Sequence, residues 1–225
     1  MFNKKTSFDE ARDQMVKKQL AARSITDPRI LRVMREIPRH YFVDEEMWEA
    51  AYRDSPLSIG HGQTISQPFI VAYMTQALQL PANGHATVLE IGTGSGYQAA
   101  ILSRLVDQVY TIERIESLAQ RALKIFEQLN IHNIEVKVTD GGYGWPEHSP
   151  YDAIIATAAA PDIPMPLIDQ LKEGGSLVAP VGPRWKQELF RLKWNGDTLT
   201  REYLVPVAFV PLVGEHGWAE EDFYE

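Results

Sequence analysis

The sequence predicts an α/β protein with a doubly wound, mostly parallel sheet, a helical N-terminal extension and a C-terminal antiparallel hairpin. Three observations lead to this prediction. Short apolar runs alternate with amphipathic helical runs between residues 87 and 181. The first apolar run passes directly into a glycine-rich turn, residues 92–96. Two β-patterned runs, separated by the turn Asn195-Gly196-Asp197, then follow near the end of the chain.

Length and composition indicate one globular unit. The chain has 225 residues, of which 44% are hydrophobic and 23% are charged, close to the average for soluble domains. We expect a single domain, 1–225, in which residues 1–80 form a helical extension and a loop and residues 81–225 form the core. The formal charge of -8 argues against a nucleic acid partner.

The absence of cysteine excludes disulfides and thiolate metal ligands, and no metal site is expected. Residues 1–10 are polar and lack the apolar centre of a signal peptide. No stretch of about 18 apolar residues occurs, so no membrane association is expected. Together these features predict a cytoplasmic protein.

The first 80 residues contain three helical patterns. Apolar residues recur at helical spacing over 8–22, and a second helix begins at Asp27-Pro28, an N-cap followed by proline, and ends before Pro38. Residues 55–68 are too rich in glycine, proline and hydroxyl side chains for a regular element. A third helix is expected over 68–80, with Ser66 at its N-cap position.

The core pattern then alternates strands with helices. Strands are expected over 87–91, 108–112, 134–138, 151–157 and 176–181, and helices over 98–106, 117–130 and 164–171. The hairpin is expected over 188–194 and 199–210. The wholly apolar Ala153-Ile154-Ile155-Ala156 is typical of a central parallel strand covered on both faces.

The glycine turn is the strongest binding signal. Gly92, Gly94 and Gly96 leave room for a ligand to approach the backbone beside a helix N-terminus. Tyr97 stands where a dinucleotide fingerprint has glycine or alanine, which argues against a nicotinamide or flavin enzyme. Glu90 repels a pyrophosphate and suits a ligand with a positive centre. An ordinary strand-to-helix turn remains the alternative.

Further polar residues follow the next two strands. In open parallel sheets, ligands bind outside the carboxyl ends of the strands. Glu113 is placed there to accept hydrogen bonds from ribose hydroxyls, and Asp140 to accept one from an exocyclic amine. Gly141 leaves a backbone N–H accessible. A solvated carboxylate and a simple Asp-Gly turn are the alternatives for these positions.

Thr64 and Ser66 offer hydroxyl donors beside the N-terminus of the third helix, where anions bind readily. No lysine or arginine occurs between Arg53 and Arg104, so an anion held here is held by neutral donors. Helix capping is the alternative role of Ser66, and the two roles are compatible.

Four segments together suggest a family. They are the loop Pro-Leu-Ser-Ile-Gly-His-Gly-Gln-Thr-Ile-Ser-Gln-Pro at 56–68, Asp-Ala-Ile-Ile at 152–155, Ala-Ala-Ala-Pro at 158–161 and Phe-Val-Pro-Leu at 209–212. With the glycine turn, they resemble the protein-L-isoaspartate O-methyltransferases, which have a Rossmann-like class I methyltransferase fold. The resemblance covers roughly residues 10–214. The tail from Gly214 onward has no clear counterpart, and Thr139 replaces a glycine of the family pattern.

The resemblance implies an S-adenosylmethionine-dependent enzyme that methylates the α-carboxylate of L-isoaspartyl residues in damaged proteins and so starts repair through a succinimide. It implies that Ser66 and Thr64 are catalytic and that Gln67 and Pro68 border the cofactor. Ile65 would lie in the substrate loop. The small residues Ala158, Ala159 and Ala160 would let a substrate backbone approach the strand ends. The expected partners are isoaspartyl proteins and peptides, and the expected state is a monomer.

Other functions remain open at this stage. The same fold can methylate another acceptor, such as RNA or a small molecule, although the net charge disfavours RNA. It can also serve as a non-catalytic module that binds the cofactor or damaged proteins. A nicotinamide oxidoreductase is the third alternative.

Overall fold

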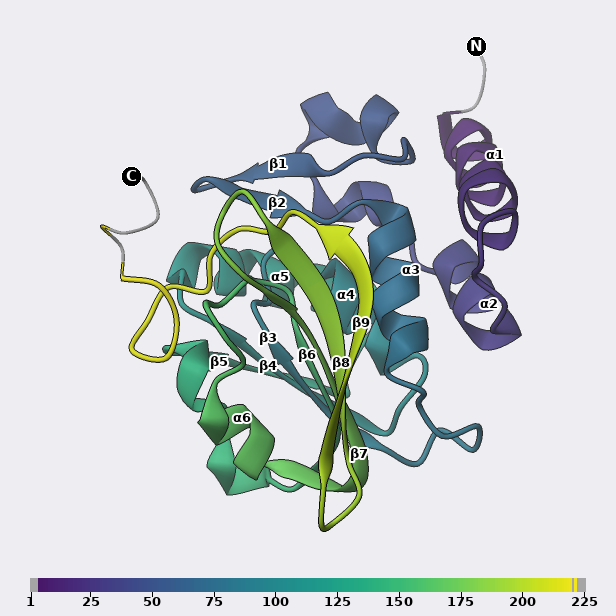
Figure 1. The fold of residues 1–225 in the computed structure, drawn as a ribbon. Helices are drawn as coiled ribbons and strands as arrows, with labels where there is room; N and C mark the ends of the chain where they lie inside the picture. Colours follow the sequence, from purple (N-terminus) through teal and green to yellow (C-terminus); the bar gives the residue numbers. More distant parts are fainter. Residues whose placement is uncertain (1–3, 220, 222–225) are drawn as a thin grey trace.

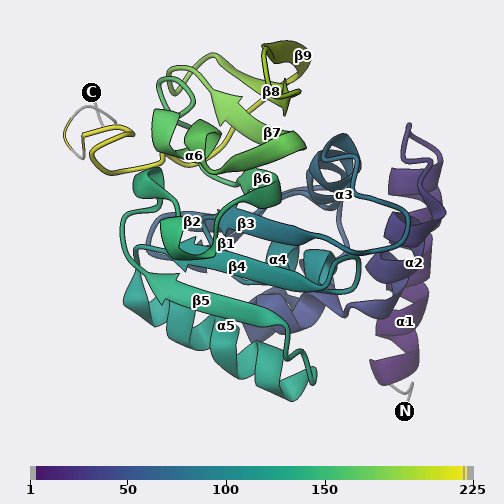
Figure 2. The same cartoon turned by 90° about the horizontal axis from the view of Figure 1, so that it is seen from below.

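A seven-stranded sheet organises the computed structural model, which describes residues 4–219 and 221. Its strands are β3 (Thr87–Ile91), β4 (Gln108–Glu113), β5 (Ile134–Val138), β6 (Tyr151–Ala156), β7 (Leu171–Val181), β8 (Gln187–Trp194) and β9 (Leu199–Val207). Their order is β5-β4-β3-β6-β7-β8-β9, which can be followed from one edge to the other in Figure 2. β3 to β7 run parallel, and β8 and β9 are antiparallel additions. The predicted mostly parallel sheet with a closing hairpin is confirmed.

The strand order reverses at β3 and β6, the point at which such sheets bind ligands. Side chains alternate between the two faces of β3. Val88 joins a hydrophobic cluster with α3 (Pro68–Ala77), α4 (Tyr97–Ser103) and α5 (Glu116–Gln128). Leu89 and Ile91 join a second cluster with α6 (Met165–Asp169). The short helices η4 (Gly141–Tyr143) and η5 (Pro146–His148) precede β6.

The N-terminal helices stand beside α3 at one side of the sheet, as Figures 1 and 2 both show. They are α1 (Lys4–Met15), a π-helical continuation η1 (Val16–Ala21) and α2 (Pro28–Glu36). Two short helices, η2 (Arg39–Phe42) and η3 (Glu45–Ala50), follow α2 and precede β1. One predicted helix over 8–22 thus corresponds to α1 with η1. Every helix in the described part of the chain is too short or too polar to cross a lipid bilayer.

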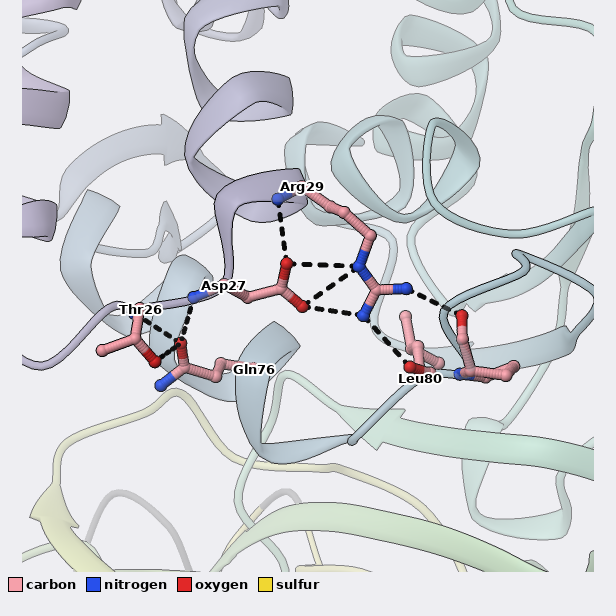
Figure 3. Close-up of polar contacts among 6 residues, drawn as sticks. Thr26, Asp27, Arg29, Gln76 and Leu80 are labelled. Atoms are coloured by element: carbon pink, nitrogen blue, oxygen red, sulfur yellow. Dashed lines mark hydrogen bonds and ion pairs between the residues drawn. The ribbon is translucent and has the colours of Figure 1, made fainter.

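Polar contacts attach α2 to the segment around α3 (Figure 3). The side chain of Asp27 accepts from the backbone N–H of Arg29 at 2.8 Å, which confirms the predicted N-cap. The guanidinium of Arg29 pairs with Asp27 at 2.7 Å and donates to the carbonyl oxygens of Leu80 and Pro81 at 3.1 and 2.7 Å. Gln76 on α3 accepts from the backbone N–H groups of Thr26 and Asp27.

The prediction that residues 55–68 form no regular element is wrong. Two short antiparallel strands, β1 (Leu57–Gly60) and β2 (Gln63–Ile65), make a hairpin there. Positive φ angles at residues 60, 61 and 62 close its turn. Ile59 and Ile65 are buried beneath it while Ser58 and Thr64 face outward, so the two-residue period of a strand is present but masked by the turn residues.

After β9 the chain returns toward the carboxyl ends of the parallel strands. β9 ends at Val207 and not at the predicted residue 210, because the backbone N–H of Ala159 donates to the carbonyl of Val210 at 2.8 Å. The backbone N–H of Leu212 in turn donates to the carbonyl of Ala159. We call residues 208–218 the C-terminal strap; its yellow ribbon lies on the side of the molecule away from α1 and α2 in Figures 1 and 2.

Candidate active site

The glycine turn connects β3 to α4 with its backbone held on both sides. The backbone N–H groups of Gly92 and Thr93 donate to the carbonyl of Ile112 at 2.8 and 3.1 Å. Gly92 has a φ of +95°, and a Cβ there would lie 2.5 Å from the hydroxyl of Thr157. Gly96 is the N-cap of α4 with a φ of +86°, and a Cβ there would lie 2.8 Å from the ring of Phe126. Both positions therefore require glycine.

Glu113 ends β4 beside this turn. One carboxylate oxygen accepts from the backbone N–H of Gly94 at 2.8 Å, and the other accepts from that of Ile115 at 2.9 Å. Each carboxylate oxygen has a second acceptor site. Because Glu113 also lines the large cavity described next, those sites can serve a ligand with two donors.

A cavity of about 940 Å³ lies outside the carboxyl ends of the parallel strands. Its walls include the predicted residues Gly92, Gly94, Glu113, Gly141 and Ala158. The β1–β2 turn and residues 207–213 form other parts of its wall. The structure thus brings together half of the residues predicted at the strand ends, and these come from four separate segments of the chain.

A second cavity, of about 450 Å³, adjoins the first, and Thr64 and Thr157 line both. Ser66, Gln67 and Ile70 line only the smaller one, whose lining residues carry no charged side chain. Within residues 4–219 and 221, no hydrogen bond is formed by the side-chain hydroxyl of Thr64 or of Ser66. Two hydroxyl groups are therefore available to a guest in a pocket without cations.

Ser66 does not cap α3. The N-cap is Gln67, one residue later than predicted, and its side chain makes no capping bond. The amide of Gln67 donates instead to the carbonyl of Asp54 at 3.1 Å. The shift arises because Pro68, with its fixed φ, takes the first helical position and leaves Ser66 outside the helix.

Two other loop residues are buried away from the cavities. Ile65 is 2% exposed and packs in the core under the β1–β2 hairpin, so its side chain is not at the position predicted for substrate contact. Pro68 is buried at the start of α3 and lines neither cavity. Pro68 therefore forms no part of the wall of either cavity, where a predicted contact with the cofactor would have to be made.

Glu90 is wholly buried inside the sheet and lines neither cavity. The hydroxyl of Thr111 donates to one of its carboxyl oxygens at 2.5 Å and lies 2.7 Å from the hydroxyl of Thr93. Burial, with a smaller effect of Glu113, raises the pKa of Glu90 to about 8. Glu90 therefore supports the glycine turn through Thr111 and Thr93, and the predicted direct contact with a ligand is wrong.

Asp140 also lines neither cavity. One of its oxygens accepts from the backbone N–H of Gly142 at 2.8 Å, and the other accepts from that of Glu215 in the C-terminal strap at 2.9 Å. A Cβ on Gly214 would lie 2.3 Å from this carboxylate. Asp140 thus holds the strap against the loop that carries Gly141, which does line the large cavity.

Of the three alanines after β6, only Ala158 lines the large cavity. The C-terminal strap covers Ala159, whose carbonyl accepts from the indole N–H of Trp218 at 3.0 Å. The backbone N–H of Ala160 donates to the carbonyl of Pro180 at the end of β7, and its carbonyl accepts from the backbone N–H of Gly182. The prediction that all three approach a substrate backbone is wrong for Ala159 and Ala160, because the chain covers these positions itself.

Several residues of the site were not predicted from the sequence. Thr157 lines both cavities, and its hydroxyl donates to the carbonyl of Gly92 at 2.6 Å. Its position at the end of β6, beside the end of β3, was a usable signal. Trp185, on the β7–β8 loop, and residues 206–208 have no local motif, because hairpin pairing alone brings them to the cavities.

Comparisons with known proteins agree with this arrangement. Residues 10–217 match the family model "Protein-L-isoaspartate(D-aspartate) O-methyltransferase (PCMT)". A protein-L-isoaspartate O-methyltransferase of Desulfotalea psychrophila is 56% identical over 94% of this chain and 98% of its own length. One from Syntrophus aciditrophicus is 54% identical with the same coverage.

Solved structures are similar over nearly the whole chain. A protein-L-isoaspartate O-methyltransferase has a TM-score of 0.83 and 31% identity, over 93% of this chain and 67% of its own. A Plasmodium falciparum protein assigned to the same enzyme, in complex with S-adenosyl-L-homocysteine, has a TM-score of 0.76 and 24% identity, over 88% and 96%. The chain belongs to the protein-L-isoaspartate(D-aspartate) O-methyltransferase family.

Proposed function

We propose that this chain transfers a methyl group from S-adenosylmethionine to the α-carboxylate of L-isoaspartyl residues in damaged proteins. The observation that carries the proposal is the pair of adjoining cavities. The large one contains the glycine turn and Glu113, and the small one offers free hydroxyl groups without any charged side chain. Family membership and the names of the relatives point to the same reaction.

The large cavity fits S-adenosylmethionine, which supplies an electrophilic methyl group when bound. We assign Gly92, Gly94, Glu113 and Gly141 to its binding. The spare acceptor sites of Glu113 suit the two hydroxyl groups of a ribose. Gly141 lines this cavity, and packing requires glycine there because a Cβ would lie 2.5 Å from the side chain of Ile91. Asp140 acts indirectly, by ordering the loop of Gly141 and the C-terminal strap.

The small cavity holds the acceptor carboxylate through Thr64 and Ser66. Carboxyl groups ionise at a pKa near 3 to 4, so the nucleophile is ready at neutral pH and no general base is needed. Neutral hydroxyl donors hold the carboxylate more weakly than a guanidinium, which leaves its oxygens more reactive. Correct orientation can contribute about 7–11 kcal/mol to such a reaction, and exclusion of water adds to it.

The same geometry explains selection of isoaspartyl over aspartyl residues. Both carry the same charge, so a cation could not distinguish them. The isoaspartyl α-carboxylate is attached to the chain through one methylene fewer, and misplacement by about 1 Å can cost on the order of a hundredfold in rate. Residues Gln67 and Ile70 complete the small cavity and limit how deep a carboxylate can sit.

The test is a methylation assay with matched peptides. The protein is incubated with S-adenosylmethionine labelled in its methyl group and with two peptides that differ only in an aspartyl or isoaspartyl linkage, and base-labile label is counted. We expect label on the isoaspartyl peptide alone. Equal labelling of both peptides would contradict the specificity, and labelling of neither would leave another acceptor or a non-catalytic binding module.

We further propose that the chain acts as a monomer in the cytoplasm on isoaspartyl proteins and peptides and does not bind nucleic acid. The net charge of -8 supports the last point. Light scattering coupled to gel filtration tests the monomer, with a mass of 25.5 kDa expected. A mass near twice that value would contradict it.

A further inference from the structure

The loop between β7 and β8 presents an indole to solvent at the rim of the large cavity. Trp185 is 82% exposed, the highest value among the large apolar side chains of the described residues. Trp185 also lines the large cavity, together with the neighbouring Arg184. Tryptophan is enriched at binding surfaces because its rigid ring offers a large contact area.

This loop is held firmly at both ends. The backbone N–H of Gly182 donates to the carbonyl of Ala160 at 3.0 Å, and that of Lys186 donates to the carbonyl of Pro183 at 2.9 Å. The buried amide of Gln187 exchanges two hydrogen bonds with the backbone of Phe209, which lines both cavities. The two ends of the loop that carries Trp185 are therefore attached to the cavity wall.

The β1–β2 turn forms another part of the wall of the large cavity. His61, Gly62 and Gln63 line the cavity there. The next residues along β2 and beyond it include Thr64 and Ser66, the proposed donors to the carboxylate. A polypeptide that places its isoaspartyl carboxylate at these hydroxyls lies next to the large cavity, whose wall contains both the β1–β2 turn and the β7–β8 loop.

We propose that Trp185 is a specificity-determining residue that contacts an apolar, preferably aromatic, side chain next to the isoaspartyl residue. The proposal rests on the proposed function. The guanidinium carbon of Arg184 lies 4.7 Å from the centre of the indole ring and helps to orient it. With most of its surface still open to solvent, the indole can stack on a flanking aromatic ring.

The test compares isoaspartyl peptides of one sequence that carry phenylalanine before the isoaspartyl residue, phenylalanine after it, or glycine at both positions. The readout is the ratio of kcat/KM between each phenylalanine peptide and the glycine peptide. For the unmodified protein we expect a preference of about 3- to 10-fold for one phenylalanine peptide, the range of a single aromatic contact. Trp185→Ala should abolish that preference, mainly through KM, and Trp185→Phe should restore part of it.

Tyr203→Ala provides the matched control. Tyr203 is 51% exposed on β9 and lines neither cavity, so this variant should keep the original preference. If the unmodified protein methylates all peptides without preference, or if Trp185→Ala keeps the preference, the role of Trp185 is refuted while the proposed function stands. If the unmodified protein methylates none of the peptides, the proposed function fails and the inference fails with it.

Discussion

The structure excludes one of the two roles that the sequence leaves open for the hydroxyl of Ser66, the capping of α3. The sequence allowed capping, binding or both. In the structure, Gln67 is the N-cap of α3, and the Ser66 side chain lines the small cavity without a partner among the described residues. This arrangement supports the proposed role of Ser66 in binding the acceptor carboxylate.

Ser66→Ala is therefore expected to lower turnover without lowering stability. A lost cap would cost about 0.5–2 kcal/mol, whereas removal of an unpartnered hydroxyl should change the free energy of unfolding by less than about 0.5 kcal/mol. Chemical denaturation and kcat on an isoaspartyl peptide measure the two effects. Ser58→Ala, on the exposed face of the same hairpin, is the control. Full activity of Ser66→Ala would remove this residue from catalysis.

Glu113→Gln should weaken binding of S-adenosylmethionine. The substitution keeps the shape but removes the charge that accepts from Gly94 and Ile115, and hydrogen bonds to charged groups contribute about 1.5–3 kcal/mol each. We expect a rise in Kd of at least about tenfold, measured by calorimetry. Glu127→Gln on the exposed side of α5 is the control. An unchanged Kd in Glu113→Gln would exclude Glu113 from the binding site.

The raised pKa of Glu90 predicts that the folded protein loses stability as the pH rises toward 8. Its pKa is raised to about 8 from the ordinary value of 4.5, so the folded state keeps a proton that the unfolded chain releases above about pH 4.5. The contribution of this proton to the free energy of unfolding is complete below that pH. It is lost as the pH rises toward 8, by up to about 1.4 kcal/mol per pH unit. Glu90→Gln cannot titrate, so its stability relative to the original protein should grow over this window.

Urea denaturation at several pH values between about 5 and 8 measures this difference. Glu127 is exposed, so the free energy of unfolding of Glu127→Gln should follow that of the original protein at every pH. If the free energy of unfolding of Glu90→Gln changes with pH in the same way as that of the original protein, Glu90 is ionised in the folded state. The protonated network with Thr111 and Thr93 is then refuted.

At the scale of elements, connections decide where the site residues lie. The hydrogen bonds of Gln76 with Thr26 and Asp27, and those of Arg29 with the carbonyls of Leu80 and Pro81, attach α2 beside α3 (Figure 3). The N-terminal end of α3 adjoins the small cavity. The C-terminal strap, anchored by Asp140 and by Trp218, forms part of the wall of the large cavity. Neither attachment touches the proposed substrate, yet both hold the elements that do.

Asp27→Ala should destabilise the protein by about 0.5–2 kcal/mol, mainly through loss of the N-cap. The half-exposed ion pair with Arg29 adds little to this value. Chemical denaturation measures the change. Asp9→Ala, which removes an exposed ion pair with Arg12 inside a helix, should cost less than about 0.5 kcal/mol. Equal losses in the two variants would contradict the importance of the cap.

At the scale of the whole molecule, one hydrophobic cluster contains residues of the N-terminal helices and of the sheet. Leu20 and Val33 belong to it together with Val88 and Val109. The N-terminal extension therefore shares its buried surface with the core, which supports the proposal of a single domain over 1–225.

A single cooperative unfolding transition is the expected consequence. Far-ultraviolet circular dichroism reports all helices and strands, and tryptophan fluorescence reports Trp48 of η3 together with Trp145 and Trp194 near the sheet. The two signals should give the same midpoint in urea. Two separate transitions would show instead that residues 1–80 and 81–225 are separate domains.

The sequence by itself determined the parallel strands of the core, its main helices and the glycine turn, because these depend on local periodicity and on residues such as Gly92 and Gly96 whose conformation is set within a few positions. It also determined that Glu113 lies at a strand end, since parallel strands bring their carboxyl ends to one edge.

Only the tertiary structure decided which strand-end residues reach the cavities. Glu90 is buried on the same face of the sheet as Val88 because of the alternation along β3. Ala159 is covered because the C-terminal strap pairs with it, and Ala160 because it pairs with the end of β7. Trp185 reaches the large cavity through the pairing of β7 with β8, and residues 206–210 reach the cavities through the pairing of β8 with β9. Such contacts join residues far apart in the sequence, and no local pattern of side chains encodes them.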